Sequence, residues 1–113
     1  MAYSLKETEE AIGDVTNLAA YMIKEFKNQK AAIAFLDRYD EAVQILEDFP
    51  FGYRGISFEY RGYEIRIKPF GTYNIFFIVD NVEDTIYILR VLKDRQNWSL
   101  ILKSQKEYHF YSV

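Results

Sequence analysis

The sequence lacks the residues on which several common kinds of protein site depend. It has no cysteine, which excludes disulfides and thiolate metal sites, and it has one histidine. That histidine, His109, lies among aromatic residues near the C-terminus without an evident partner, so a histidine-based metal site or a Ser–His–Asp triad is nearly excluded. Glycine-rich phosphate loops and nucleophile elbows are missing too. The sequence therefore predicts no metal and no cofactor.

Long apolar segments are also missing. No run approaches the roughly 20 apolar residues that span a bilayer, and the N-terminus has no signal-peptide core. Half of the 113 residues are nonetheless apolar and 18% are aromatic, which favours a well-filled core over disorder. We therefore expect a single domain, residues 1–113, in the cytoplasm and not in a membrane.

Positive charge is scarcer than negative charge, and the net charge is −3. Residues 1–60 contain six Lys or Arg and eleven Asp or Glu, whereas residues 61–113 contain eight and six. A protein with this balance is not generally attracted to polyanions. A surface that faces an anion is expected in the C-terminal half, if there is one.

Two amphipathic helices are predicted in the N-terminal half, where apolar residues recur at spacings of three and four. Thr8 and Asn28 are suited to N-cap them, and Pro50 ends the second because proline cannot continue a helix. The short polar break between them predicts a helical hairpin. The two apolar faces consist of Ala11, Ile12, Val15, Leu18, Ala19, Met22, Ile23 and Phe26, and of Ala32, Phe35, Leu36, Tyr39, Ala42, Val43 and Leu46.

After Pro50 the period of the apolar pattern changes to two, which is typical of strands. Residues 56–60 and 63–71 alternate between polar and apolar, whereas residues 73–80 and 85–92 are apolar on both faces and indicate central strands. A short strand over residues 2–6 is expected before the first helix, and a short helix with a tail or edge strand is expected over residues 95–113. The predicted fold class is α+β, with the helices on one face of an antiparallel sheet.

Five basic residues on the predicted strands are the main candidates for a functional site. Arg66 and Lys68 are expected on the polar face of one strand. Arg90 lies within the last core strand, and Lys93 and Arg95 follow at its end. Guanidinium and ammonium groups suit phosphate or carboxylate oxygens and an anionic transition state. The alternative is a solvated sheet face, with Arg90 paired to a carboxylate.

Four segments, residues 11–26, 31–50, 62–80 and 85–102, together resemble the RelE/ParE superfamily of bacterial type II toxin–antitoxin toxins. The most family-like features are an arginine in the strand after a Gly-Tyr step, the stretch "YNIFF", and "ILRVL" leading into "RQNW". No single motif is highly specific, but their order and spacing together are. The resemblance covers the chain from about Tyr3 to Leu102.

The resemblance implies a toxin neutralised by a cognate antitoxin, which wraps an extended, partly helical segment around the groove and sheet of the toxin. RelE-like members cleave mRNA on the ribosome without a metal, whereas ParE-like members bind and poison DNA gyrase. For this chain the resemblance implies catalytic roles for Arg66, Lys68, Lys93 and Arg95, and contacts to substrate or partner for Tyr63, Tyr73 and Arg90.

Some residues depart from the ribonuclease pattern. Asn74 stands where RelE-like enzymes commonly have a cation, and Lys93 stands where many relatives have histidine or tyrosine. A net charge of −3 also fits poorly with binding among ribosomal RNA. The "ILRVL" ending is closer to the ParE branch. A ribosome-dependent endonuclease, a gyrase inhibitor and a divergent inactive member therefore all stay open.

The supply of aromatic residues after Pro50 bears on the antitoxin. It exceeds what one small core needs, so some of these side chains are expected on the surface that an antitoxin covers. The residues concerned are Tyr53, Phe58, Tyr60, Phe70 and Tyr73.

Overall fold

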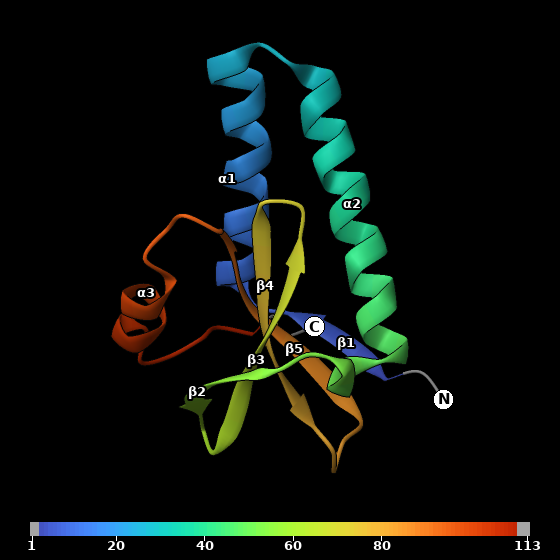
Figure 1. Ribbon diagram of the computed structural model, residues 1–113, viewed down its shortest axis with the longest axis vertical. Coiled ribbons are helices and arrows are strands. Elements are labelled where there is room, and N and C mark those ends of the chain that lie inside the picture. Colours follow the sequence, from blue (N-terminus) through green and yellow to red (C-terminus); the bar gives the residue numbers. More distant parts are fainter. Residues whose placement is uncertain (1–2, 111–113) are drawn as a thin grey trace.

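The computed structural model describes residues 3–110, and its elements follow the predicted order (Figure 1). The predicted start of the first strand at Ala2 and the predicted end of the tail, residues 111–113, lie outside the described residues. The elements are β1 (Ser4–Glu7), α1 (Glu9–Phe26), α2 (Gln29–Asp48), the 3-10 helix η1 (Pro50–Gly52), β2 (Gly55–Tyr60), β3 (Tyr63–Phe70), β4 (Tyr73–Asp80), β5 (Thr85–Lys93) and α3 (Trp98–Ser104).

The five strands form one sheet in the order β1-β5-β4-β3-β2. Strands β2 to β5 are antiparallel neighbours, which confirms the predicted meander. β1 pairs with β5 in parallel, with Leu5 opposite Ile86, and this pairing was not predicted. It joins strands separated by almost the whole chain, and the local alternation of side chains carries no information about such a partner.

The helical hairpin begins and ends as its capping residues indicate. The Thr8 hydroxyl accepts a hydrogen bond from the Ala11 amide, and the Asn28 side chain accepts one from the Ala31 amide, both at 3.0 Å. These bonds satisfy amide groups in the first turn that have no partner within the helix. No helix within residues 3–110 is long and apolar enough to cross a membrane.

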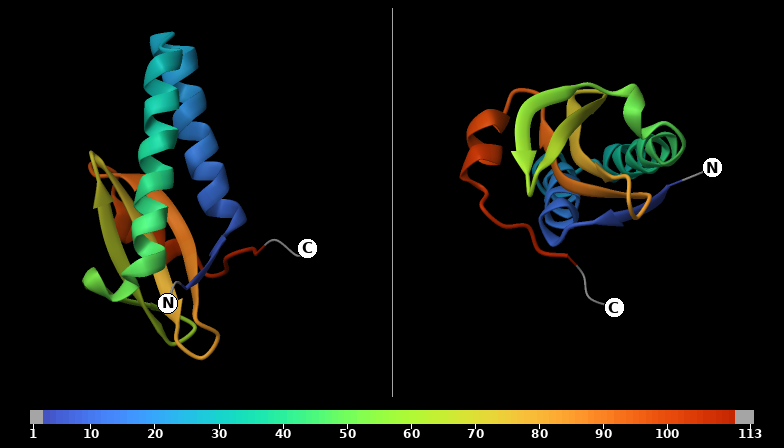
Figure 2. Two further views of the ribbon diagram at one scale, coloured as in Figure 1. Left: turned by 90° about the vertical axis from the view of Figure 1, so that its right-hand side faces the viewer. Right: turned by 90° about the horizontal axis from the view of Figure 1, so that it is seen from below.

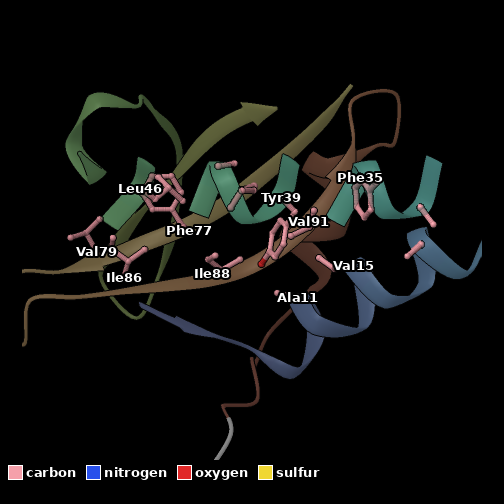
Figure 3. Packing of buried hydrophobic residues seen from close by; sticks show 14 residues of the cluster. Ala11, Val15, Phe35, Tyr39, Leu46, Phe77, Val79, Ile86, Ile88 and Val91 are labelled. Atoms are coloured by element: carbon pink, nitrogen blue, oxygen red, sulfur yellow. The ribbon is translucent and has the colours of Figure 1, made fainter. Parts of the chain in front are cut away.

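Two hydrophobic cores lie on the two faces of the sheet. The first lies between the sheet and the hairpin and includes Phe35, Tyr39, Leu46, Phe77 and Ile88 (Figure 3). The second contains side chains of α3 and the C-terminal tail, which lie on the side of the sheet away from α2 (Figure 2). The predicted helices on one face are therefore present, and the short third helix covers the other face.

The hairpin extends past the ends of the strands at the β3–β4 turn (Figure 1). Its apolar faces are buried only where the sheet lies beneath them. Ile23, Phe26 and Leu36, which we predicted on the buried faces, are 48%, 66% and 38% exposed. Helical periodicity identifies the face correctly but does not show how far along the helix the sheet reaches.

Candidate functional site

Arg66 and Lys68 do not project from a solvated face of the sheet, so that part of the prediction is wrong. Arg66 lies opposite Phe77 and Lys68 lies opposite Ile75 in the β3–β4 register. Both partners belong to the core under the hairpin, and directly opposite residues of antiparallel strands share a face. Lys68 is only 6% exposed. Alternation separates the two faces of a strand, but it does not show what covers the more polar one.

The segment that covers these two cations is η1 with the residues just after it. Arg66 Nη1 donates a hydrogen bond to the Tyr53 carbonyl at 2.7 Å, and its guanidinium lies 4.9 Å from the centre of the Phe51 ring. Lys68 Nζ donates to the Tyr53 hydroxyl, also at 2.7 Å. The ion pair of Arg66 with Glu64 is long, at 3.8 Å. Both predicted catalytic cations therefore hold the η1 segment against β3.

Arg90 is held in an ion pair with a carboxylate of α1. Its Nε and Nη2 donate to the two carboxylate oxygens of Asp14 at 2.7 and 2.9 Å, and the Val91 amide donates to the same carboxylate at 3.0 Å. The hydrogen bond to Asp14 raises the pKa of Arg90 above its ordinary value. These contacts support the structural alternative considered for Arg90, which is the joining of β5 to α1.

Lys93 and Arg95 are exposed at the end of β5. Lys93 lies opposite Tyr73 in the β4–β5 register, and its ammonium lies 5.3 Å from the centre of the Tyr21 ring on α1. Lys93 is thus the one predicted catalytic cation that lines the groove beside the helical hairpin. Arg95 lies two residues further along, in the turn before α3.

That groove has a volume of about 400 Å³ and lies between the outer part of the hairpin and the β3–β4 turn. Of the described residues that line it, two are charged, and both are basic: Arg38 and Lys93. The rest are mostly apolar or aromatic. A groove of this kind suits a ligand that combines apolar and acidic groups. The uncharged lining residues are Leu18, Tyr21, Met22, Phe26, Ala31, Ala34, Phe35, Phe70, Gly71, Thr72 and Tyr73.

The two predicted tyrosines lie on different faces of the sheet. Tyr73 packs its ring 4.8 Å from that of Phe35 in the groove, and burial raises the pKa of its hydroxyl. Tyr63 packs against the second core, where the Asp80 carboxylate raises the pKa of its hydroxyl. A tyrosine with a raised pKa is a poorer base at neutral pH. Tyr63 therefore does not share a site with Tyr73 and Lys93.

The helical half of the groove, above all Tyr21, Phe35 and Arg38, was not predicted as part of a site. A signal was present, because the apolar faces of both helices continue to the turn that joins them. Among residues 3–110 no group of three or more acidic or histidine side chains could hold a metal ion.

The expected surface aromatics are mostly used inside the fold. Tyr60 is 7% exposed, and Phe58 is half-buried against the second core. Tyr53, Phe70 and Tyr73 are half-buried against the first core. Tyr60 is therefore not among the surface aromatics that were expected, and the other four are only partly accessible. The larger exposed apolar side chains lie instead mostly on the helices and around η1, with Val82 in the β4–β5 turn.

Comparison with known families then identifies the chain. A model of the family described as "ParE toxin of type II toxin-antitoxin system, parDE" matches residues 5–98. The chain belongs to this ParE toxin family. The sequence-based assignment to the RelE/ParE superfamily, and to the toxin component of a type II toxin–antitoxin system, is confirmed. A search of curated protein sequences finds no match.

Solved structures of the same architecture come from three toxin–antitoxin systems. A chain of the ParDE system of P. aeruginosa is 21% identical, with a TM-score of 0.64 over 81% of this ParE-family chain and 96% of its own length. A chain of the RelBE2 complex of Mycobacterium tuberculosis is 20% identical, with a TM-score of 0.56, and the match covers 82% of this chain and 99% of that one. A chain of the RelE–RelB complex of Pyrococcus horikoshii is 19% identical, with a TM-score of 0.55, and the match covers 85% of this chain and 99% of that one. At these identities the likeness concerns the fold.

Proposed function

We propose that this ParE-family toxin arrests growth by binding a protein target, DNA gyrase, without catalysing a reaction, and that a cognate antitoxin neutralises it by occupying the groove beside the hairpin. The ribonuclease function implied for RelE-like members is the alternative. Family membership supports the gyrase target, since the matching family model is that of ParE toxins.

The observation that carries the proposal is the dispersal of the predicted catalytic residues. Cleavage of RNA without a metal needs a base, an acid and cations around one phosphate. Within residues 3–110, Arg66 and Lys68 on β3 are hydrogen-bonded to Tyr53, whereas Lys93 lies two strands away at the end of β5. The contacts to Tyr53 engage two of the predicted catalytic cations, which disfavours a phosphate site shared with Lys93.

Candidates for the base are equally poor. The pKa of Tyr73 is raised by burial, which disfavours proton abstraction at neutral pH. His109 is hydrogen-bonded to Glu10 in the first turn of α1, whereas the groove lies along the second half of that helix. The net charge of −3 likewise disfavours a surface that works among ribosomal RNA.

The charge and lining of the groove support the antitoxin assignment. Arg38 and Lys93 are basic in a protein that is acidic overall, so they attract a carboxylate to an otherwise apolar groove. A segment with large apolar side chains and an acidic residue complements this surface. Two of the similar solved structures are described as toxin–antitoxin complexes or RelE–RelB complexes, and the third as a ParDE system.

The decisive experiment is to induce the toxin and record which process stops first. We expect DNA replication to stop and the SOS response to begin while translation continues, with co-expression of the neighbouring antitoxin gene restoring growth. An early stop of translation with cut mRNA would support the ribonuclease instead. Absence of any arrest would identify a divergent inactive member.

A further inference from the structure

Three exposed apolar side chains lie together in sequence at the C-terminal end of α2. Ile45 is 46% exposed, Phe49 is 68% exposed and Phe51 is 46% exposed. Ile45 and Phe49 are four residues apart on the helix and its cap, a spacing that makes side chains neighbours, and Phe51 follows on η1. We call these three residues the Phe49 patch. Aromatic side chains that stay exposed in the free protein are typical anchors of protein interfaces.

The chain that follows the Phe49 patch is held by two cations that the sequence suggested as catalytic. Arg66 binds the Tyr53 carbonyl and lies over the Phe51 ring, and Lys68 binds the Tyr53 hydroxyl. On the helix side, the Phe49 amide donates to the Ile45 carbonyl at 3.0 Å, and Pro50 is buried. The segment is therefore fixed at both ends, which lowers the entropy that binding would cost.

Acidic residues border the Phe49 patch on its α2 side, whereas Arg66 lies over Phe51 on the other side. Glu41 and Asp48 are exposed and lie four residues before and three residues after Ile45, which places them on the same face of α2. The groove at the other end of α2 has the opposite character, with Arg38 and Lys93 at its rim. At about 1.5 Å per helical residue, Ala34 in the groove and Phe49 in the patch are about 22 Å apart along the helix, and the groove residue Arg38 lies three residues before Glu41.

We propose that the Phe49 patch binds the cellular protein target of the toxin. The matching surface of that target is an apolar pocket bordered by basic side chains. The inference rests on the proposed function and assigns the groove and the patch to different partners. The acidic border of the patch repels the acidic segment that suits the groove, and it attracts a basic one. Arg66 and Lys68 are positioning residues, which act by holding η1.

The test is the double substitution Ile45→Ser/Phe49→Ser, which removes two side chains of the Phe49 patch that make few internal contacts. We expect loss of growth arrest on induction, since removing an anchor weakens binding by about tenfold or more. Affinity for the cognate antitoxin should be unchanged, and the melting temperature should fall by less than about 3 °C. The matched control is Val82→Ser/Leu100→Ser, which removes exposed apolar side chains elsewhere (87% and 60% exposed).

Reversal of the border charge farther from Arg38 supplies a second variant, Asp48→Lys, which keeps the apolar side chains. We expect weaker arrest and unchanged antitoxin affinity. The inference is overturned if either patch variant arrests growth as the wild type does, or if antitoxin binding is lost together with arrest. Failure of the proposed function is distinguishable, because the wild-type toxin would then cause no arrest or would stop translation first.

Discussion

Lys68 and Tyr53 form a hydrogen bond of 2.7 Å between a buried ammonium and a phenol hydroxyl that belong to segments 15 residues apart. Nothing in the alternation of β3 distinguishes this lysine from a solvated one. The bond gives Lys68 a structural role, because it fixes the chain that follows α2 and η1 against β3. The other partner, the Tyr53 hydroxyl, lies outside the strands and can be removed without disturbing the sheet.

Tyr53→Phe should destabilise the protein by about 1–3 kcal/mol, because it leaves the buried ammonium of Lys68 without its hydrogen-bond acceptor. Lys68→Met should cost less, since the Tyr53 hydroxyl is only half-buried and can bind water. Urea unfolding of both single variants and of the double variant measures the coupling between them. Equal effects of the two single substitutions would contradict this asymmetry.

Asp14→Ala should destabilise the protein by about 2–4 kcal/mol, because Arg90 loses its carboxylate and the Val91 amide loses its acceptor. The side chains of Arg90 and Asp14 are 18% and 14% exposed, so water compensates only in part. The pair Asp14→Leu/Arg90→Met should recover much of the loss. Thermal or urea unfolding gives the values, and a loss below about 0.5 kcal/mol would show that the pair is weakly coupled to folding.

Arg66→Ala separates a positioning role from a catalytic one. The substitution removes a charged donor from the Tyr53 carbonyl, so we expect a loss of about 1–2 kcal/mol of stability and a partial loss of growth arrest. The arrest should weaken in parallel with that of the Phe49 patch variants. If Arg66→Ala abolished arrest while Ile45→Ser/Phe49→Ser left it intact, a direct role of Arg66 in chemistry would be supported.

The clasp between His109 and Glu10 should depend on pH. The hydrogen bond that the His109 ring donates to the Glu10 carboxylate raises the pKa of His109 above 6.5. The stabilisation from His109 is therefore complete below pH 6.5 and is lost as the pH rises through the folded-state pKa. Burial raises the pKa of Glu10, but the hydrogen bonds that His109 donates to it outweigh burial and lower this pKa below 4.5. The stabilisation that Glu10 contributes is therefore complete above pH 4.5 and is lost as the pH falls through the folded-state pKa. The clasp should therefore be strongest between about pH 4.5 and 6.5.

Because the chain has one histidine, proton NMR reports its titration directly. Glu10→Gln should return the pKa of His109 toward 6.5. A titration midpoint unaffected by this substitution would rule out the clasp in solution.

Lys93→Glu and Arg38→Glu should slow association with the cognate antitoxin by about tenfold each at low salt, because the groove would then repel an acidic segment. The effect should shrink as salt rises, and folding should be unaffected because both side chains are exposed. Stopped-flow mixing at two ionic strengths gives the rates. Arg95→Glu, in the turn beyond the groove, is the matched control, and an equal effect there would point to general charge attraction.

The sequence predicted those parts of the fold that depend on neighbours along the chain. Periodicity located both helices, and Thr8 and Asn28 marked their starts because capping is a contact within one turn. Alternation located β2 to β5 and the turns between them. The family resemblance added the toxin assignment, which single motifs could not carry.

Periodicity and capping residues did not predict contacts between segments that are distant in the sequence. The environment of Arg66 and Lys68 depends on where η1 returns to the sheet, and that path follows from packing around Pro50. The groove likewise depends on the length by which the hairpin exceeds the sheet, which places Phe35 and Arg38 beside Lys93. The candidate site was therefore predicted only at Lys93, Tyr73 and Phe70.

The beginning and the end of the described chain meet at Thr8. Its backbone amide and hydroxyl donate to the Ile88 and Leu89 carbonyls, it forms a β-bridge with Phe110, and the neighbouring Glu9 amide donates to the His109 carbonyl at 2.8 Å. Contacts across such a separation form late, because the intervening loop must close first. We therefore expect that a nascent toxin cannot complete its sheet until β5, which pairs with β1, has left the ribosome. Synthesis of β5 would then set the moment at which a newly made chain becomes dangerous to the cell.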